Sequence, residues 1–222
     1  MFTSWEDALF SAEAILYIWI VLVLIIAIHE FGHAFAGLAL NEKVGGITIG
    51  FGSIFKFKFL DIPISIGLFP IGGMALVGDL GTPWQKRFII AAAGPLATFM
   101  AAAVTYIILD GIAAIDYLVA NLFFVKPILD ALVHGQSMWL PQLLGVSSHD
   151  TALIEILLRA SANLNLIFGV FNLLPIPVLD GGRMSFSLLR GIFGKKVEYI
   201  EAVLIPLSVI GLVAWFIYDA FR

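Results

Sequence analysis

The sequence predicts an α-helical integral membrane protein, with about four transmembrane helices and a membrane-associated β-hairpin between the first and the second. Of its 222 residues, 61% are hydrophobic and only 13% are charged, whereas soluble proteins carry about 45–50% apolar and about 25% charged residues. Four segments reach or approach the length of about 20 apolar residues that a membrane crossing takes. Between the first two, apolar and polar residues alternate with the period of a strand.

The four apolar segments differ in what interrupts them. The first contains the string HEFGH, the second is free of charge, the third is uncharged but carries several asparagines and prolines, and the fourth is short. No internal repeat or low-complexity linker separates them, so residues 1–222 are expected to form a single domain. The predicted spans are residues 14–40, 88–109, 160–179 and 202–218.

The basic residues predict the orientation, because loops rich in Lys and Arg stay in the cytoplasm. The N-terminal arm has none, and residues 110–155 have only Lys126 among several acids. We therefore expect a multi-pass protein of the plasma membrane, with both termini and the 110–155 loop outside. The basic residues lie in the other two connections, as Lys43, Lys56, Lys58, Lys86 and Arg87, and as Arg183, Arg190, Lys195 and Lys196.

Residues 111–132 are ambiguous. They are largely apolar, but Asp116, Lys126, Pro127 and Asp130 interrupt them. We interpret this part of the outer loop as an interfacial helix or a cap on the outer face. The alternative is an additional, poor membrane span.

Residues 45–79 are predicted to form β-hairpin structure. The strings FKFKF and IPISI alternate with period two, and glycines punctuate the stretch. Because open strand edges are not tolerated against lipid, such an apolar sheet is expected to sit inside the protein or to line a cavity. Its edge could receive another extended chain by strand addition. The alternative is a small cytosolic sheet that covers the helix ends.

The string HEFGH is the strongest indication of chemistry. His29 and His33 are four residues apart, which places both imidazoles on one face of a helix. In the H-E-x-x-H pattern two histidines hold zinc and the intervening glutamate, here Glu30, serves as general base. The alternative is that neighbouring helices satisfy these polar groups, but ionisable residues inside a membrane are functional by default.

A catalytic zinc site needs a third protein ligand. His29 lies about 21 Å down the first span, at roughly 1.5 Å per residue, and therefore in the cytoplasmic half of the membrane. The remaining histidines, His134 and His149, belong to the outer loop. Asp180 follows the third span on the cytoplasmic side and is the favoured ligand, although an Asp-Gly pair also suits a turn or a helix cap.

Composition excludes several other classes. The chain has no cysteine, so neither disulfides nor thiolate ligands are available. A net charge of −4 with no basic tail gives no reason to invoke nucleic acid. Asn163 and Asn165 in the third span suit hydrogen bonds between helices.

Together these motifs resemble the site-2 protease family, the zinc intramembrane metalloproteases. The resemblance rests on HEFGH in a first span, NLLPIPVLDGG ending a later one, IGFGSIFKF and IGLFPIGGM in the hairpin region, and AAAGPLATF in the second span. It is closest to bacterial four-span members that process anti-sigma factors or signal-peptide remnants. Two features depart from them: about 45 residues between spans two and three are too few for the usual PDZ domain, and Thr98 stands where relatives commonly have asparagine.

The resemblance implies one zinc ion per chain, held by His29, His33 and Asp180, with Glu30 as the catalytic base. It further implies an intramembrane endopeptidase whose partners are single-span membrane proteins in the lipid bilayer. A non-catalytic metal-binding scaffold or a transporter is the alternative. The substrate-binding candidates are Asn172, Pro175, Gly73 and Met74.

Overall fold

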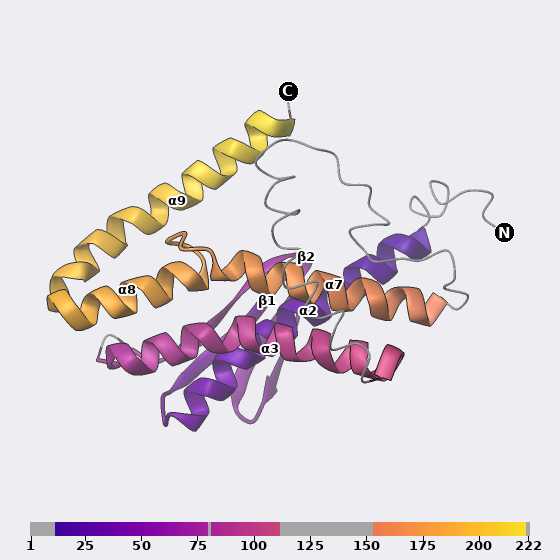
Figure 1. The fold of residues 1–222 in the computed structure, drawn as a ribbon, viewed down its shortest axis with the longest axis horizontal. Coiled ribbons are helices and arrows are strands. Elements are labelled where there is room, and N and C mark those ends of the chain that lie inside the picture. Colours follow the sequence, from indigo (N-terminus) through magenta and orange to yellow (C-terminus); the bar gives the residue numbers. More distant parts are fainter. Residues whose placement is uncertain (1–11, 80, 112–152, 221–222) are drawn as a thin grey trace.

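The computed structural model describes residues 12–79, 81–111 and 153–220. Figure 1 shows two β-strands passing behind a layer of helices, with the last helix leaving this layer at an angle. Most of the 110–155 loop, including the expected interfacial helix at residues 111–132 and both His134 and His149, lies outside the described residues.

Four helices are long and apolar enough to cross a membrane, which confirms the predicted fold class. They are α2 (Ala12–Ala39), α3 (Trp84–Asp110), α7 (Leu153–Leu173) and α9 (Val197–Ala220). The helices α3 and α9 begin four and five residues before the predicted spans (88 − 84 and 202 − 197), since their polar first turns were left out of the prediction.

The predicted boundaries of the third span, 160–179, are wrong at both ends. Helix α7 begins at Leu153 and ends at Leu173. Its first turns carry Glu155 and Arg159, whose charges lower the hydropathy of this segment. In the structure the two side chains form an ion pair at 3.1 Å. It stops before Pro175 and Pro177 because a residue that precedes proline is disfavoured in the helical conformation.

A helix that the sequence analysis did not predict follows. Helix α8 (Asp180–Phe193) begins directly after the proline segment, and the short η2 (Gly194–Lys196) joins it to α9. Leu179, not Asp180, is the N-cap residue of α8, and it makes no side-chain capping bond. Asp180 is therefore the first residue of the helix, with its carboxylate available for another role.

The predicted hairpin consists of β1 (Val44–Phe59) and β2 (Ile62–Val77), joined by Leu60 and Asp61 at positive φ angles of 51° and 60°. The two long strands fold back on themselves. Ile47, for example, pairs with both Ala75 and Ile64. The start of β1 therefore lies between two segments of β2, and the end of β2 forms an outer edge of the sheet.

The hairpin lies alongside α2 over much of its length. Near the start of the helix, Trp19 Nε1 donates to the Leu68 carbonyl at 2.6 Å. Near its end, a Cβ added to Gly37 would lie 2.2 Å from Val77. These 18 helical residues (37 − 19) correspond to about 27 Å of helix. The sheet is thus at the depth of the first span, whereas a cover over the helix ends would not reach Trp19.

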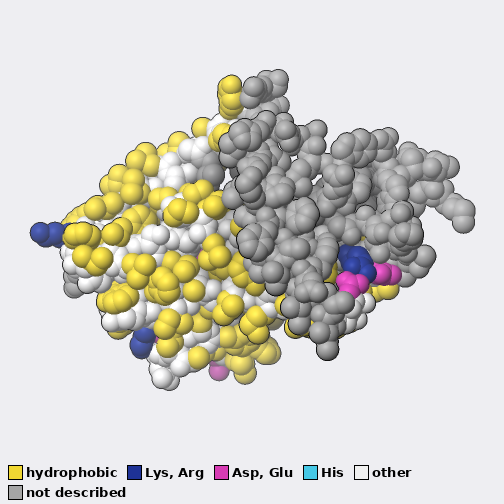
Figure 2. Space-filling view, viewed as in Figure 1, with side chains coloured by type: hydrophobic (Ala, Val, Ile, Leu, Met, Phe, Trp, Pro, Cys, Tyr) yellow, Lys and Arg dark blue, Asp and Glu magenta, His cyan; other side chains and the backbone are white. Residues whose placement is uncertain are grey.

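Close helix contacts hold the helical layer together. A Cβ added to Gly32 of α2 would lie 2.6 Å from the Ala93 carbonyl of α3. The Tyr106 hydroxyl of α3 donates to Asn163 of α7, which confirms an interhelical bond for this asparagine, while Asn165 donates within its own helix to Ser161. Figure 2 shows hydrophobic side chains over the described part of one outer face, as suits contact with lipid.

Candidate metal centre

Helix α2 and the start of α8 bring three potential ligands together. His29 Nε2 lies 2.8 Å from Asp180 Oδ2, and His33 Nε2 lies 3.2 Å from the same oxygen. One ligand atom from each residue falls within 4.8 Å of the others, and each residue is at most 5% exposed. The fold therefore brings the Asp180 carboxylate at the start of α8 to the two histidines of α2 that were predicted as ligands.

The hydrogen bonding of His33 indicates which kind of partner its second ring nitrogen suits. His33 Nδ1 lies 2.6 Å from the Ile90 carbonyl oxygen, which can only accept, so Nδ1 carries a hydrogen. In a neutral imidazole the Nε2 lone pair then faces the Asp180 carboxylate. Two acceptors at 3.2 Å repel each other unless a proton or a metal ion lies between them.

The donor set fits a zinc ion. Zinc takes imidazole nitrogen and carboxylate oxygen at about 2.0–2.2 Å, which puts tetrahedral ligand atoms about 3.3 Å apart. The separations of 2.8 and 3.2 Å at Asp180 Oδ2 lie at or below this value, and all three ligand atoms fall within 4.8 Å of one another. The bond from His33 to Ile90 is of the kind that orients metal-bound histidines. Asp180 also has Arg183 Nη1 at 3.8 Å from its second carboxylate oxygen.

Gly94 of α3 packs directly against the two histidines of the cluster. The sequence analysis did not single out this residue. A Cβ at this position would lie 2.3 Å from His33 Nε2 and 2.8 Å from His29 Nε2. The absence of a side chain therefore leaves room at the ligand atoms. The string AAAGPLATF contained the signal, because a glycine beside proline in a span allows close approach.

Glu30 is 5% exposed and lies next to the cluster in α2. On its other side is Gly73 of β2, where an added Cβ would meet Glu30 Oε1 at 2.7 Å. Gly73 thus lets the strand approach the carboxylate.

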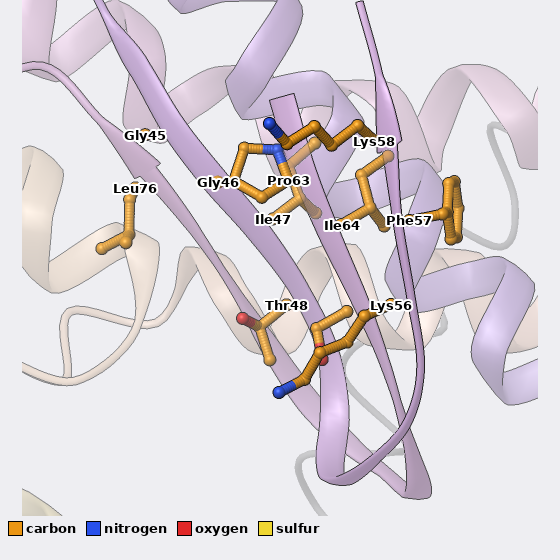
Figure 3. A pocket seen from close by; sticks show the side chains of 11 residues that line it. Gly45, Gly46, Ile47, Thr48, Lys56, Phe57, Lys58, Pro63, Ile64 and Leu76 are labelled. Atoms are coloured by element: carbon orange, nitrogen blue, oxygen red, sulfur yellow. The ribbon is translucent and has the colours of Figure 1, made fainter. Parts of the chain in front are cut away.

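A cavity of about 340 Å³ opens beside His33. The outer edge of β2 from Met74 to Val77, with the following Gly78, forms one wall, while α3, α8 and α9 contribute the others. Met74 is 45% exposed there. A second hollow, of about 470 Å³, lies within the hairpin between Lys56, Lys58 and Leu76 (Figure 3), and none of the candidate ligands lines it.

The remaining substrate-binding candidates do not line the cavity beside His33. Asn172 is buried near the end of α7, and its Nδ2 donates to the Phe168 carbonyl at 2.9 Å. The Phe168 ring packs edge-on against His29 with 5.0 Å between centroids, so Asn172 is one helical turn from a residue that contacts the cluster. Pro175 is exposed in the segment between α7 and α8.

Comparison with known proteins agrees with this geometry. The family model described as peptidase family M50 matches residues 17–214. A zinc metalloprotease of Methanocaldococcus jannaschii is 26% identical over 192 residues, which make up 86% of this chain and 39% of that protein.

Two bacterial proteins named zinc metalloprotease RasP match shorter parts. The one from Bacillus licheniformis is 49% identical over 42 residues, 19% of this chain and 10% of its own length. The one from Shouchella clausii is 47% identical over 45 residues, 20% of this chain and 11% of its own. The chain therefore spans well under half the length of these curated relatives. Because the family model covers nearly all of the described residues, the chain belongs to peptidase family M50, the site-2 protease family.

Proposed function

We propose that this protein is a zinc-dependent intramembrane endopeptidase, which hydrolyses peptide bonds within or near the transmembrane segments of other membrane proteins. One observation carries the proposal. Two buried histidines of a helix long enough to span the membrane meet a buried aspartate of another helix, and Glu30 lies beside them. Burying these groups in an apolar span is costly unless they bind a cation or act in chemistry.

In this proposal His29, His33 and Asp180 hold the metal ion and Glu30 is the general base. Zinc supplies a Lewis acid that makes a water more acidic and polarises the scissile carbonyl. Glu30 accepts the proton of the attacking water, whose oxygen bonds to the carbonyl carbon. Glu30 then passes the proton to the nitrogen that leaves as the carbon–nitrogen bond breaks. One carboxylate beside the cluster serves both transfers.

The outer edge of β2 is the proposed docking site for the substrate. A peptide bond in a helix is shielded by its hydrogen bonds, so the substrate has to unwind before hydrolysis. Adding it as a strand along Gly73–Val77 replaces the lost backbone bonds. This edge leads from Glu30 along the cavity that opens at His33.

The four substrate-binding candidates have different proposed roles. Met74 contacts the substrate within the cavity. Asn172 retains a second amide hydrogen besides the one bonded to Phe168, and it donates this hydrogen to a substrate carbonyl. Gly73 keeps β2 close to Glu30, and Pro175 ends α7 so that the chain can turn into α8.

The proposed substrates are single-span membrane proteins, such as anti-sigma-factor-like proteins or signal-peptide remnants. The excess of basic residues between α2 and α3, and between α7 and α9, supports termini outside and the site in the cytoplasmic half of the plasma membrane.

Cleavage of a model single-span substrate in liposomes tests the proposal. Wild type should cleave with zinc and stop when a chelator removes it. Glu30→Gln should lower the rate by about 10²–10⁴, the range for general acid–base catalysis. Glu42→Gln is a matched control, because Glu42 belongs to the ion pair with Lys86 at the far end of α2. Undiminished cleavage by Glu30→Gln would refute the proposed base, and a zinc-loaded wild type inert towards varied substrates would favour a scaffold or transporter.

The unwinding step has its own test. Substrates with Gly, Pro or Asn in the span should be cleaved faster than those with uninterrupted Leu and Ala, because their helices open at lower cost. Equal rates for both substrate sets would refute unwinding as a requirement.

A further inference from the structure

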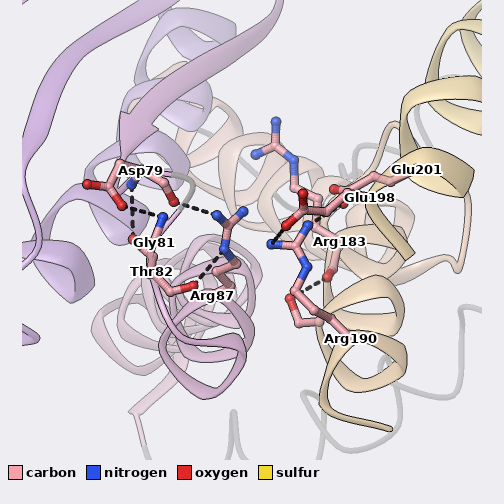
Figure 4. A network of polar contacts seen from close by, with 9 residues as sticks. Asp79, Gly81, Thr82, Arg87, Arg183, Arg190, Glu198 and Glu201 are labelled. Atoms are coloured by element: carbon pink, nitrogen blue, oxygen red, sulfur yellow. Dashed lines mark hydrogen bonds and ion pairs between the residues drawn. The ribbon is translucent and has the colours of Figure 1, made fainter. Parts of the chain in front are cut away.

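Three arginines line the cavity that opens beside His33. Arg87 comes from the first turn of α3, and Arg183 and Arg190 come from α8. Figure 4 shows this cluster with Asp79, Gly81 and Thr82 on one side and Glu198 and Glu201 of α9 on the other. The metal chemistry proposed above gives none of them a function.

The three arginines differ in how their charge is compensated. Arg190 Nη2 donates to Glu201 at 2.9 Å, and its Nη1 lies 3.7 Å from Glu198. Two carboxylates of α9 therefore neutralise Arg190.

Arg87 and Arg183 are not neutralised in this way. Arg87 donates to two backbone carbonyls, from Nε to Thr82 at 3.0 Å and from Nη2 to Asp79. Neutral carbonyls do not compensate its charge, so only the more distant carboxylates of Glu201, Glu198 and Asp79 act on it. The side chain of Arg183 is 48% exposed, and in the described part of the chain its ion pair is with Asp180 at 3.8 Å, too long for a hydrogen bond. Its donors thus remain available.

The rest of the cavity suits an extended, mainly apolar peptide. Its other walls include Met74, Leu76 and Val77 of β2, Ile90 and Ala91 of α3, Phe186 of α8 and Ile205 of α9. Two arginines without a hydrogen-bonded carboxylate in the wall of such a cavity favour one type of polar partner. A guanidinium fork binds a carboxylate through two parallel hydrogen bonds, which a neutral amide or a cation cannot accept in the same way.

Helical spacing places the pair close to the metal cluster. Arg183 is three residues after Asp180, and Arg87 is three residues before Ile90, whose carbonyl accepts from His33. Each is thus about 4.5 Å along its helix from a residue of the site. With the reach of the arginine side chain, a carboxylate bound here lies about two to four residues from the scissile bond, at about 3.3 Å per extended residue.

We propose that Arg87 and Arg183 select substrates that present a carboxylate about two to four residues from the scissile bond. This carboxylate is an Asp or Glu side chain or the C-terminal group of a shortened substrate. The inference rests on the proposed endopeptidase function and adds a specificity determinant to it.

The test compares pairs of single-span substrates in liposomes with the full-length, zinc-loaded protein. The members of a pair differ by Glu against Gln at one position, and the position is moved from one to six residues on either side of the cleaved bond. Wild type should show a kcat/KM ratio of Glu to Gln of about ten at positions two to four on one side. A tenfold ratio corresponds to the lower end of the range for a charge-assisted hydrogen bond. We expect the lower end because Arg183 is half exposed to solvent. Shortened substrates ending in carboxylate or carboxamide separate the C-terminal source from the side-chain source.

Variants connect the preference to the two arginines. Arg183→Gln should bring the ratio towards one, and Arg183→Glu should reverse it in favour of a Lys-bearing substrate. Arg87→Lys, which keeps a charge near Thr82 but loses the guanidinium fork, should reduce the ratio partially. Lys86→Gln is the matched control, because Lys86 is next to Arg87 but pairs with Glu42 at 2.7 Å and does not line the cavity. It should keep the ratio.

Each result decides one point. If wild type cleaves every pair with a ratio near one, the carboxylate preference is refuted while the endopeptidase function stands. If the preference exists but Arg183→Gln and Arg183→Glu both retain it, the arginine assignment is refuted. If no substrate is cleaved in a zinc-dependent manner, the proposed function itself fails, an outcome that is distinct from the other two.

Discussion

Helices α3 and α9 have the same mean hydropathy of 1.9 over their most apolar windows, yet they occupy different environments. A third of the α3 window is buried inside the protein, against 6% of the α9 window. Helix α3 packs on α2, α7 and α8, whereas α9 contacts mainly α8 and η2 among the described elements. Hydropathy therefore indicates that a helix can cross a membrane, but not whether it builds a site or faces lipid.

Small residues account for much of the difference. Association of helices in lipid depends on close packing rather than on the hydrophobic effect, so glycine and alanine gather at contacts. Gly94 of α3 lies against both metal-binding candidates, whereas a Cβ added to Gly211 of α9 would have nothing within 4 Å. These two glycines allow matched tests of the comparison.

The largest effect is expected from Gly94→Ala. The new methyl group would lie 2.3 Å from His33 Nε2, so either the imidazole or the helix has to move. We expect zinc affinity to fall about a hundredfold, the upper range for disturbing the support of a ligand. Competition titration with a zinc chelator measures this. Gly211→Ala should bind zinc as wild type does, and equal affinities for all three proteins would contradict the close approach of α3.

Gly73→Ala should affect turnover rather than metal binding. Its methyl group would meet Glu30 Oε1 at 2.7 Å and displace the proposed base. We expect kcat to fall about a hundredfold, within the range for general-base catalysis, with zinc content unchanged. The control is Gly45→Ala, where the nearest atom would be at an ordinary 3.6 Å from Leu76. Loss of zinc from Gly73→Ala would show that β2 supports the ligands as well.

Gly32→Ala tests the packing of α2 on α3. Its methyl group would lie 2.6 Å from the Ala93 carbonyl, so the two backbones would have to separate. We expect a loss of about 1–3 kcal/mol in the free energy of unfolding, typical of overpacking. Gly211→Ala, free of such contacts, should stabilise slightly because alanine favours a helix. Denaturant unfolding in detergent micelles compares the two variants. Equal stabilities would contradict the proposed difference in packing between α3 and α9.

The smallest effect concerns the ion pair that ties the end of α2 to the start of α3. Lys86 lies 2.7 Å from Glu42 and lowers the pKa of the Glu42 carboxyl. The stabilisation is therefore fully present above the ordinary glutamate pKa and is lost as pH falls through the lowered value of the folded state. Glu42→Gln should melt slightly below wild type at pH 7, with the difference vanishing once the pH falls below the lowered pKa of Glu42. A difference in Tm that does not change with pH would contradict this origin.

The predictability of the site differed from residue to residue. His29, Glu30 and His33 were found through local spacing, since residues four apart share a helical face whatever the rest of the fold does. Asp180 required an additional topological argument, and the structure brings its carboxylate to the histidines. The hairpin was found because alternation with period two is also a local property, and its strands match the predicted 45–79 region closely.

Other features could not be predicted in this way. The role of Gly94 depends on contact between α2 and α3, which no local pattern encodes. Helix α8 was missed because its short amphipathic turns lie between two stronger membrane signals. The third span was misplaced because charged residues in its first turns, which pair with each other and with Asp110, lower its hydropathy.

By itself, the sequence determined that the chain is a membrane protein, that a helix carries two histidines and a glutamate with the spacing of a zinc-binding motif, and that a strand-rich segment follows. These properties depend on residues close together in the chain, whose period and polarity can be read directly. Only the tertiary structure decided which glycines line the His–Asp cluster, how the hairpin folds back along α2, and which arginines lack a hydrogen-bonded carboxylate. Those properties depend on the distances between segments that are far apart in the sequence. His33 and Arg183, for example, are 150 residues apart (183 − 33) but line the same cavity, and such proximity exists only once the helices have packed.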